Sequence, residues 1–181
     1  MCGIVGTATR RQSAGILIEG LQRLEYRGYD SAGFAVLDSK GVLRRERRVG
    51  KVKALREAQL ESGLNGQLGI AHTRWATHGK PTEANAHPHC SSDVVAVVHN
   101  GIIENHEPLR VKLQAAGYVF ESETDTEVVA HLVHLEVEKA DSFVSGVQKA
   151  LSQLVGAYAV AVIHAEHPDH IIAARLGSPL V

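Results

Sequence analysis

The chain has 181 residues, of which 44% are hydrophobic and 22% are charged, and its formal net charge is −1. This length and composition are typical of one globular domain, and the near-zero charge gives no support to a nucleic-acid or anionic-membrane partner. No segment has the pattern of a secretory signal or the apolar length of a membrane span. The two cysteines, Cys2 and Cys90, do not suggest a disulfide framework. We therefore expect one domain in a reducing, cytoplasmic compartment.

The N-terminal half of the chain has apolar runs that alternate between strand and helix character. In chain order we predict a strand over residues 3–9, a helix capped by Ser13 and followed by Gly28, a hairpin of strands 32–37 and 42–49, a helix over 53–60 and a strand over 67–73. The helix after Ser13 is expected to bury Ile16, Leu17, Leu21 and Leu24 on one side. The charged run 44–48 favours a solvated strand edge over a phosphate grip.

The C-terminal half continues the alternation after a polar segment over residues 74–93. In chain order we predict a strand over 94–99, a helix from Asn105 to Gly117, a helix behind the capping-box sequence 124–127, a helix over 143–154 that Gly156 closes, and strands over 157–164 and 171–175. The polar segment holds the only tryptophan and three of the eleven histidines, which indicates a functional loop. About seven strands and five helices indicate antiparallel or mixed sheets with helix layers outside.

Cys2 directly follows Met1. Removal of Met1 would leave a thiol and a free α-amine on one residue, with ordinary pKa values of about 8.5 and about 7.7–8.0. Such a pair can act as nucleophile and base. The alternative is that Cys2 is a small, inert apolar residue at the start of a strand.

Asn100 and Gly101 follow the apolar strand 94–99. An Asn side-chain amide and a Gly backbone N–H are suitable donors to the oxyanion that forms during amide hydrolysis, and Gly permits a close approach of substrate. The alternative is an ordinary Asn-Gly turn.

Polar residues after the strand 67–73 suit an amino-acid ligand. Arg74 can hold a carboxylate through two parallel hydrogen bonds, and Thr77 and His78 can add contacts to the same group. Asp125 can bind an ammonium group or simply favour the start of its helix. Trp75 has polar neighbours, which indicates an interface or lid rather than the core.

Other ligand classes receive little support. The histidine clusters 87–90 and 164–170 lack zinc-site spacing, and no Gly-rich phosphate loop is present. We therefore expect neither a metal nor a cofactor.

Six segments, in order, resemble one family: residues 1–6, 24–33, 72–79, 85–89, 99–109 and 122–128 are similar to the glutaminase domain of the glutamine–fructose-6-phosphate aminotransferases. The resemblance runs over residues 2–181, which would form one glutaminase domain. It implies an α+β, N-terminal-nucleophile fold, a four-layer αββα sandwich of two antiparallel sheets. The chain stops where one more strand would begin, so we expect the fold to be truncated at its C-terminal end and the synthase domain to be absent.

The resemblance also implies roles for named residues. Cys2 would be the nucleophile, with Asn100 and Gly101 as the oxyanion hole. L-Glutamine would be bound by four side chains, those of Arg74, Thr77, His78 and Asp125. Trp75 would lie on a mobile loop that closes over glutamine, and Arg27 would support the site.

Two functional hypotheses follow. In the first, the chain hydrolyses L-glutamine to L-glutamate and ammonia through a Cys2 thioester, and the ammonia serves glucosamine 6-phosphate formation in a full-length, homo-oligomeric enzyme. In the second, the chain is a non-catalytic fragment that only binds glutamine or only folds. Truncation, or a retained Met1 that turns the Cys2 amine into an amide, would have this effect.

Overall fold

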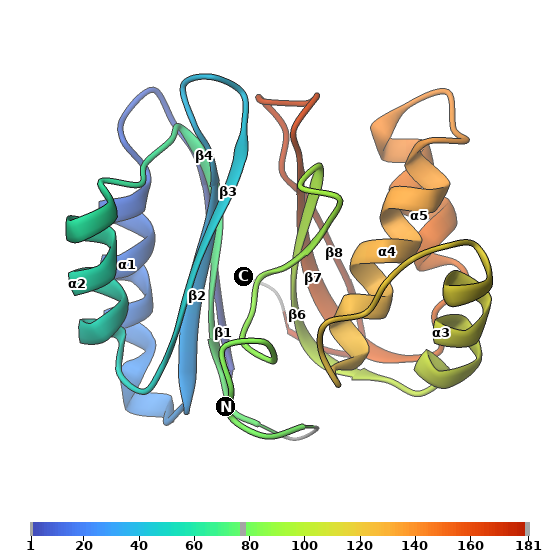
Figure 1. Cartoon of the computed structure of the whole chain (residues 1–181), viewed down its shortest axis with the longest axis horizontal. Coiled ribbons are helices and arrows are strands. Elements are labelled where there is room, and N and C mark those ends of the chain that lie inside the picture. Colours follow the sequence, from blue (N-terminus) through green and yellow to red (C-terminus); the bar gives the residue numbers. More distant parts are fainter. Residues whose placement is uncertain (1, 77–78, 180–181) are drawn as a thin grey trace.

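The computed structural model describes residues 2–76 and 79–179, which form two four-stranded antiparallel sheets that face one another (Figure 1). The first sheet has the order β1 (Gly3–Ala8), β4 (Leu68–Arg74), β2 (Ser31–Leu37), β3 (Leu43–Val49). The second has the order β5 (His89–Ser91), β6 (Val95–Ile103), β7 (Gly156–His164), β8 (Ile172–Leu176).

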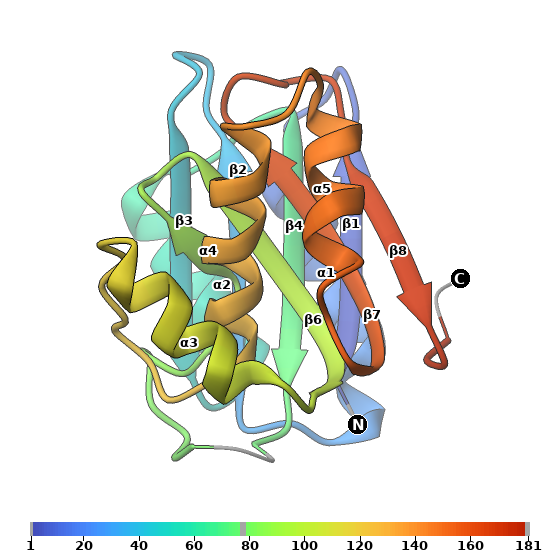
Figure 2. The ribbon, with the colours of Figure 1, turned by 90° about the vertical axis from the view of Figure 1, so that its right-hand side faces the viewer.

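Helices cover the outer face of each sheet (Figures 1 and 2). Those on the first sheet are α1 (Ala14–Leu24) and α2 (Val52–Ser62), and those on the second are α3 (His106–Ala115), α4 (Asp125–Val137) and α5 (Phe143–Leu151). The predicted α+β, four-layer αββα sandwich is therefore confirmed. Among the described helices, none combines the length and apolarity needed to cross a membrane.

The central strands β4 and β6 each carry a long apolar run because both of their faces are covered. In β4, Ile70 packs between the sheets whereas Ala71 packs against the helices of the first sheet. In β6, Val98 packs between the sheets whereas Val97 packs against the helices of the second sheet. The two-residue period of a strand then decides on which side the polar residues of β4 and β6 lie.

Most predicted elements are confirmed, but several boundaries and caps are wrong. Strand β5 lies inside the segment predicted to be a loop, and a 3₁₀ turn over Glu25–Arg27 separates α1 from Gly28. Ser13 does not cap α1, because its hydroxyl donates to the carbonyl of Gly66 instead (2.8 Å). Ile16 is exposed rather than buried.

In the C-terminal half of the chain, the predicted cap of α3 and the predicted end of α5 also differ from the structure. The Asn105 side chain makes no cap hydrogen bond to α3; it donates to the Gln153 carbonyl (2.8 Å) and accepts from the Val155 N–H (2.9 Å). Helix α5 ends at Leu151, so Leu154 lies beyond it. A local sequence pattern did not distinguish a cap from a tertiary contact here.

The charged run 44–48 lies on β3, which is an edge strand as predicted. The expectation of a purely solvated edge is wrong for two of its residues. Arg47 Nη1 donates to the carbonyls of Ala84 and Ala86 (both 3.0 Å), and Arg45 Nη1 donates to that of Pro88 (3.4 Å). Burial lowers the pKa of Arg47 to about 10. These arginines therefore hold the segment that leads into β5.

Candidate functional site

A cavity of about 540 Å³ is lined by residues from the end of β4 and from the start of the chain. These two parts of the backbone lie at the bottom of Figure 1. The volume of the cavity is in the usual range for a small-ligand site. The predicted site residues that line it come from five segments, and they are Cys2, Arg27, Arg74, Trp75, Asn100, Gly101 and Asp125. The two remaining predicted residues, Thr77 and His78, lie outside the described residues.

Cys2 immediately precedes β1 and is half-buried. Its sulfur accepts a hydrogen bond from the backbone N–H of Trp75 (3.2 Å) and lies 3.8 Å from the Trp75 carbonyl oxygen. The next residue, Gly3, donates its N–H to Thr73 Oγ1 (3.1 Å). The start of the chain is thereby held against the end of β4, with the thiol at the cavity wall.

Asn100 lies in β6 and connects the two sheets. Its Oδ1 lies 2.7 Å from His72 Nε2 on β4, and its Nδ2 donates to the backbone carbonyl of Cys2 (3.4 Å). The neighbouring Gly101 has a φ of 134°, and a Cβ atom there would lie 2.1 Å from the carbonyl oxygen of Ala157 on β7. Only glycine fits this backbone conformation and this close strand approach.

Asp125 occupies the first turn of α4 and is buried. Its Oδ2 accepts from the backbone N–H of Ile103 (2.9 Å), which fixes the carboxylate at the end of β6. Its Oδ1 lies 4.0 Å from Nδ1 of His99, and that nitrogen is 2.9 Å from Thr126 Oγ1. Burial lowers the pKa of His99, although the Asp125 carboxylate opposes this shift. A fixed carboxylate in the cavity wall can hold a cationic group of a ligand.

The segment that carries Trp75 is anchored by Asp30. The Asp30 N–H donates to the Arg74 carbonyl (2.8 Å), and its carboxylate accepts from the Ala76 N–H. The Trp75 ring packs on Gly28, where an added Cβ would lie 3.0 Å from the ring, and the residue is 53% exposed. Trp75 therefore lies at the mouth of the cavity rather than in the core.

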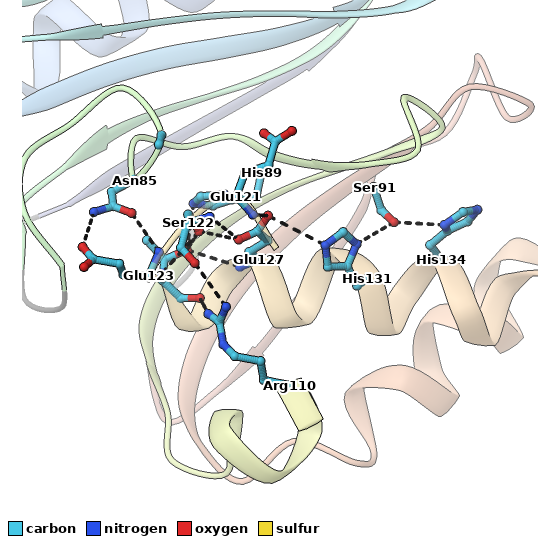
Figure 3. Close-up of polar contacts among 12 residues, drawn as sticks. Asn85, His89, Ser91, Arg110, Glu121, Ser122, Glu123, Glu127, His131 and His134 are labelled. Carbon is cyan, nitrogen blue, oxygen red and sulfur yellow. Dashed lines mark hydrogen bonds and ion pairs between the residues drawn. The ribbon is translucent and has the colours of Figure 1, made fainter. Parts of the chain in front are cut away.

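A polar network holds the beginning of α4, and thus Asp125, in place (Figure 3). Thr124 caps the helix, since its side chain accepts from the Glu127 N–H. The Glu127 carboxylate does not return to Thr124 as a capping box would; it accepts from the N–H groups of Glu121 (2.8 Å) and Ser122 (2.7 Å) and from the Ser122 hydroxyl (2.6 Å). Arg110 donates to the Ser122 and Thr124 carbonyls (3.1 and 2.8 Å).

We expect Glu127→Gln to destabilise the protein by about 2–4 kcal/mol at pH 7, because charge-assisted hydrogen bonds contribute about 1.5–3 kcal/mol each and an amide NH₂ would face buried donors. Burial raises the pKa of Glu127, but the hydrogen bonds to its carboxylate outweigh this and lower it to about 2.

This stabilisation is complete above the ordinary glutamate pKa and is lost as the pH falls towards about 2. Urea unfolding between pH 3 and 7 measures both effects. Glu138→Gln, at an exposed carboxylate on the C-cap residue of α4, is the control and should change stability by less than about 0.5 kcal/mol. Equal stability and equal acid sensitivity of Glu127→Gln and wild type would contradict this role.

Residues beyond those predicted also belong to the site. His72 contacts Asn100, and His87, His99 and Thr126 line the cavity. The sequence carried one signal for His72: it lies two positions before Arg74 in the same strand, so both face the same side. Strand alternation indicated that His99 and its neighbour Asn100 face opposite sides, but no signal indicated that α4 covers the side of His99 and the first sheet the side of Asn100.

This sandwich, with a cysteine at the start of its first strand and an Asn–Gly pair across the cavity, has the architecture of the glutamine amidotransferases. Glutamine phosphoribosylpyrophosphate amidotransferase from B. subtilis superposes with a TM-score of 0.70 at 27% identity, over 91% of this chain and 35% of that one. A glutamine aminotransferase class-II domain protein from Silicibacter pomeroyi shares the fold alone, with a TM-score of 0.62 at 15% identity over 100% of this chain and 79% of that one.

The sequence profile of the family described as "Glutamine amidotransferase domain" matches residues 72–177, and the chain belongs to this family. Over all 181 residues the chain is 62% identical to the glutamine–fructose-6-phosphate aminotransferases [isomerizing] of Pseudomonas aeruginosa and Haemophilus influenzae. It spans 30% of the length of each of these relatives.

Proposed function

We propose that this chain hydrolyses the side-chain amide of L-glutamine, with Cys2 as the nucleophile once Met1 has been removed. The observation that carries the proposal is that Cys2, Arg74, Asn100, Gly101 and Asp125 line one cavity although they come from separate parts of the sequence. A thiol, an amide donor, a guanidinium and a carboxylate are the groups that this reaction requires.

In the proposed first step, the Cys2 α-amine takes the thiol proton and the sulfur attacks the glutamine amide carbon. Asn100 Nδ2 and the Gly101 N–H would stabilise the oxyanion that forms on the amide oxygen. The carbon–nitrogen bond then breaks, and the amine gives its proton to the departing nitrogen, which leaves as ammonia. In the second step, water attacks the γ-glutamyl thioester with the same amine as base, and glutamate and the free thiol result.

Substrate recognition is proposed to use the two charged ends of glutamine. The buried Arg74 would hold the α-carboxylate by paired hydrogen bonds, with Thr77 and His78 adding contacts, and the fixed Asp125 carboxylate would bind the α-ammonium group. Trp75 at the mouth would cover bound glutamine, and Arg27 beside it would support the closed site.

We further propose that residues 2–181 act as the glutaminase domain of a longer, cytoplasmic and homo-oligomeric enzyme. The names of the relatives indicate the use of the ammonia, which is to aminate fructose 6-phosphate. That step, which gives glucosamine 6-phosphate, would need a synthase domain that is not among these residues. The glutaminase step itself needs no metal or cofactor.

The test is an assay of glutamate and ammonia release by purified protein whose intact mass shows that Met1 is absent. We expect one glutamate and one ammonia for each glutamine consumed, and at least tenfold slower hydrolysis of asparagine, whose amide would fall short of the thiol. Protein that retains Met1 should bind glutamine without hydrolysing it. Absence of hydrolysis by the processed protein would overturn the proposal and leave a binding module.

We expect Arg74→Lys to raise the KM for glutamine about 10–100-fold, because a lysine replaces paired, planar hydrogen bonds with a single point charge. The kcat should change less than KM, since the α-carboxylate is held equally in the ground and transition states. Steady-state kinetics measure this split. Arg56→Lys on the exposed surface of α2 is the matched control. An unchanged KM for Arg74→Lys would show that another group binds the carboxylate.

A further inference from the structure

The side-chain amide of Asn100 is oriented by two contacts of opposite kind. One neighbour is the backbone carbonyl oxygen of Cys2, 3.4 Å from Nδ2. A carbonyl oxygen can only accept, so the NH₂ end of the amide must face Cys2. The other end, Oδ1, then faces His72 Nε2 at 2.7 Å. Since Oδ1 can only accept, the proton in this short contact belongs to His72 Nε2.

His72 is well suited to hold this one arrangement. It lies in the central strand β4, where it pairs with Ile4 on β1 and Gly33 on β2, and it is fully buried. Its ring packs against that of His87, with the ring centroids 4.2 Å apart. Burial lowers the pKa of His72 to about 3, so the imidazole is neutral near pH 7 and its single N–H is the one directed at Asn100.

Without this donor, the Asn100 amide could rotate by half a turn. Its oxygen would then face Cys2 and the reacting group, where it would repel a developing oxyanion rather than donate to it. The hydrogen bond from His72 therefore distinguishes the productive orientation of the amide from the unproductive one.

We propose that His72 is a positioning residue whose Nε2–H fixes the Asn100 amide with Nδ2 directed towards the reaction centre at Cys2. This inference rests on the proposed glutaminase function. His72 itself need not touch glutamine, because it acts through Asn100.

The direct test compares His72→Met, which keeps the bulk without a donor, with His72→Gln, whose amide nitrogen can reach the position of Nε2, and with His72→Asn, which is too short to reach it. We expect Met and Asn to lower the kcat for glutamine hydrolysis about 10–100-fold, which corresponds to the loss of one well-aligned hydrogen bond. The KM should stay within about threefold, and Gln should retain most of the activity. Thermal unfolding identifies a variant that is merely unfolded.

A double-mutant cycle separates positioning from general support. In an Asn100→Ala background, His72→Met should have no further effect on kcat, because the amide that it positions is gone. A purely structural role would give the same loss in both backgrounds, and this result would overturn the inference.

The remaining outcomes are also decisive. Full activity of both His72→Met and His72→Asn would overturn the inference. If His72→Met does not fold, the contrast between Gln and Asn decides, and equal activity of these two would overturn it. If wild-type protein is inactive on glutamine, the proposed function fails and the inference fails with it. If wild-type protein is active and substitutions of His72 leave kcat unchanged, only the inference fails.

Discussion

Replacing Cys2 with alanine is expected to abolish glutamine hydrolysis, with a loss of at least about 10⁴ in kcat. The substitution removes the nucleophile, and only the water reaction in a binding cavity remains. Removal of a nucleophile in enzymes of this kind typically costs several orders of magnitude, since the oxyanion donors and substrate binding alone accelerate the reaction weakly. The assay is glutamate release under saturating glutamine, with intact mass confirming that Met1 is absent from both proteins.

The matched control is Cys90→Ala, the same substitution at the second cysteine of the chain. Cys90 lies in β5 and packs with the apolar residues between the sheets, and it is not among the residues that line the cavity. We expect Cys90→Ala to keep wild-type kcat and KM. Comparable activity of Cys2→Ala and Cys90→Ala would show that Cys2 is not the nucleophile.

Asn100→Asp is expected to lower kcat by about two to three orders of magnitude, the usual cost of removing one oxyanion donor. The aspartate keeps the size of the side chain and an oxygen that can accept from His72, but it replaces the Nδ2 donor with an oxygen near the Cys2 carbonyl. A negative oxygen there also opposes a developing oxyanion. The KM for glutamine should change less than fivefold, because the donor acts mainly in the transition state.

Asn100→Ala distinguishes the two effects in Asn100→Asp. It removes the donor without adding charge, so its kcat should lie between those of wild type and Asn100→Asp. Asn105→Ala is the control outside the cavity, since this asparagine holds Gln153 and Val155; it should lower stability and leave kcat unchanged. A loss confined to KM in Asn100→Asp would assign Asn100 to substrate binding instead.

Periodicity predicted most of the strands and helices, because the central strands are long and buried on both faces, whereas the helices carry an apolar stripe on one side. The four-layer arrangement was an expectation from the family resemblance. Periodicity failed for β5, which has only three residues and follows a loop held by Arg45 and Arg47. It also failed at Ser13 and Asn105, where the side chains bond to distant backbone groups. These contacts depend on which segments meet in three dimensions, and a local pattern does not contain that information.

The residues of the candidate site could be predicted from the sequence, but the hydrogen bonds between them could not. The resemblance to a family named the residues, and the position of Arg74 at the end of a strand indicated contact with a ligand. Asn100 was predicted to follow a strand that ends at residue 99, but β6 continues to Ile103 and contains it. The contact between His72 and Asn100 depends on the facing of two sheets whose strands are far apart in sequence. The Glu127 carboxylate accepts from the N–H groups of residues 121 and 122 and not from that of its helix cap. This choice likewise depends on the path of the preceding loop.

The most direct test of the central claim is to locate the covalent intermediate. Processed wild-type protein is mixed with glutamine, quenched in acid within the first turnover, digested and examined by mass spectrometry. We predict one γ-glutamyl group per chain, on the N-terminal peptide and on the sulfur of Cys2, and none in Cys2→Ala. A γ-glutamyl group on another residue, or full hydrolysis by Cys2→Ala, would contradict the assignment of Cys2 as the nucleophile.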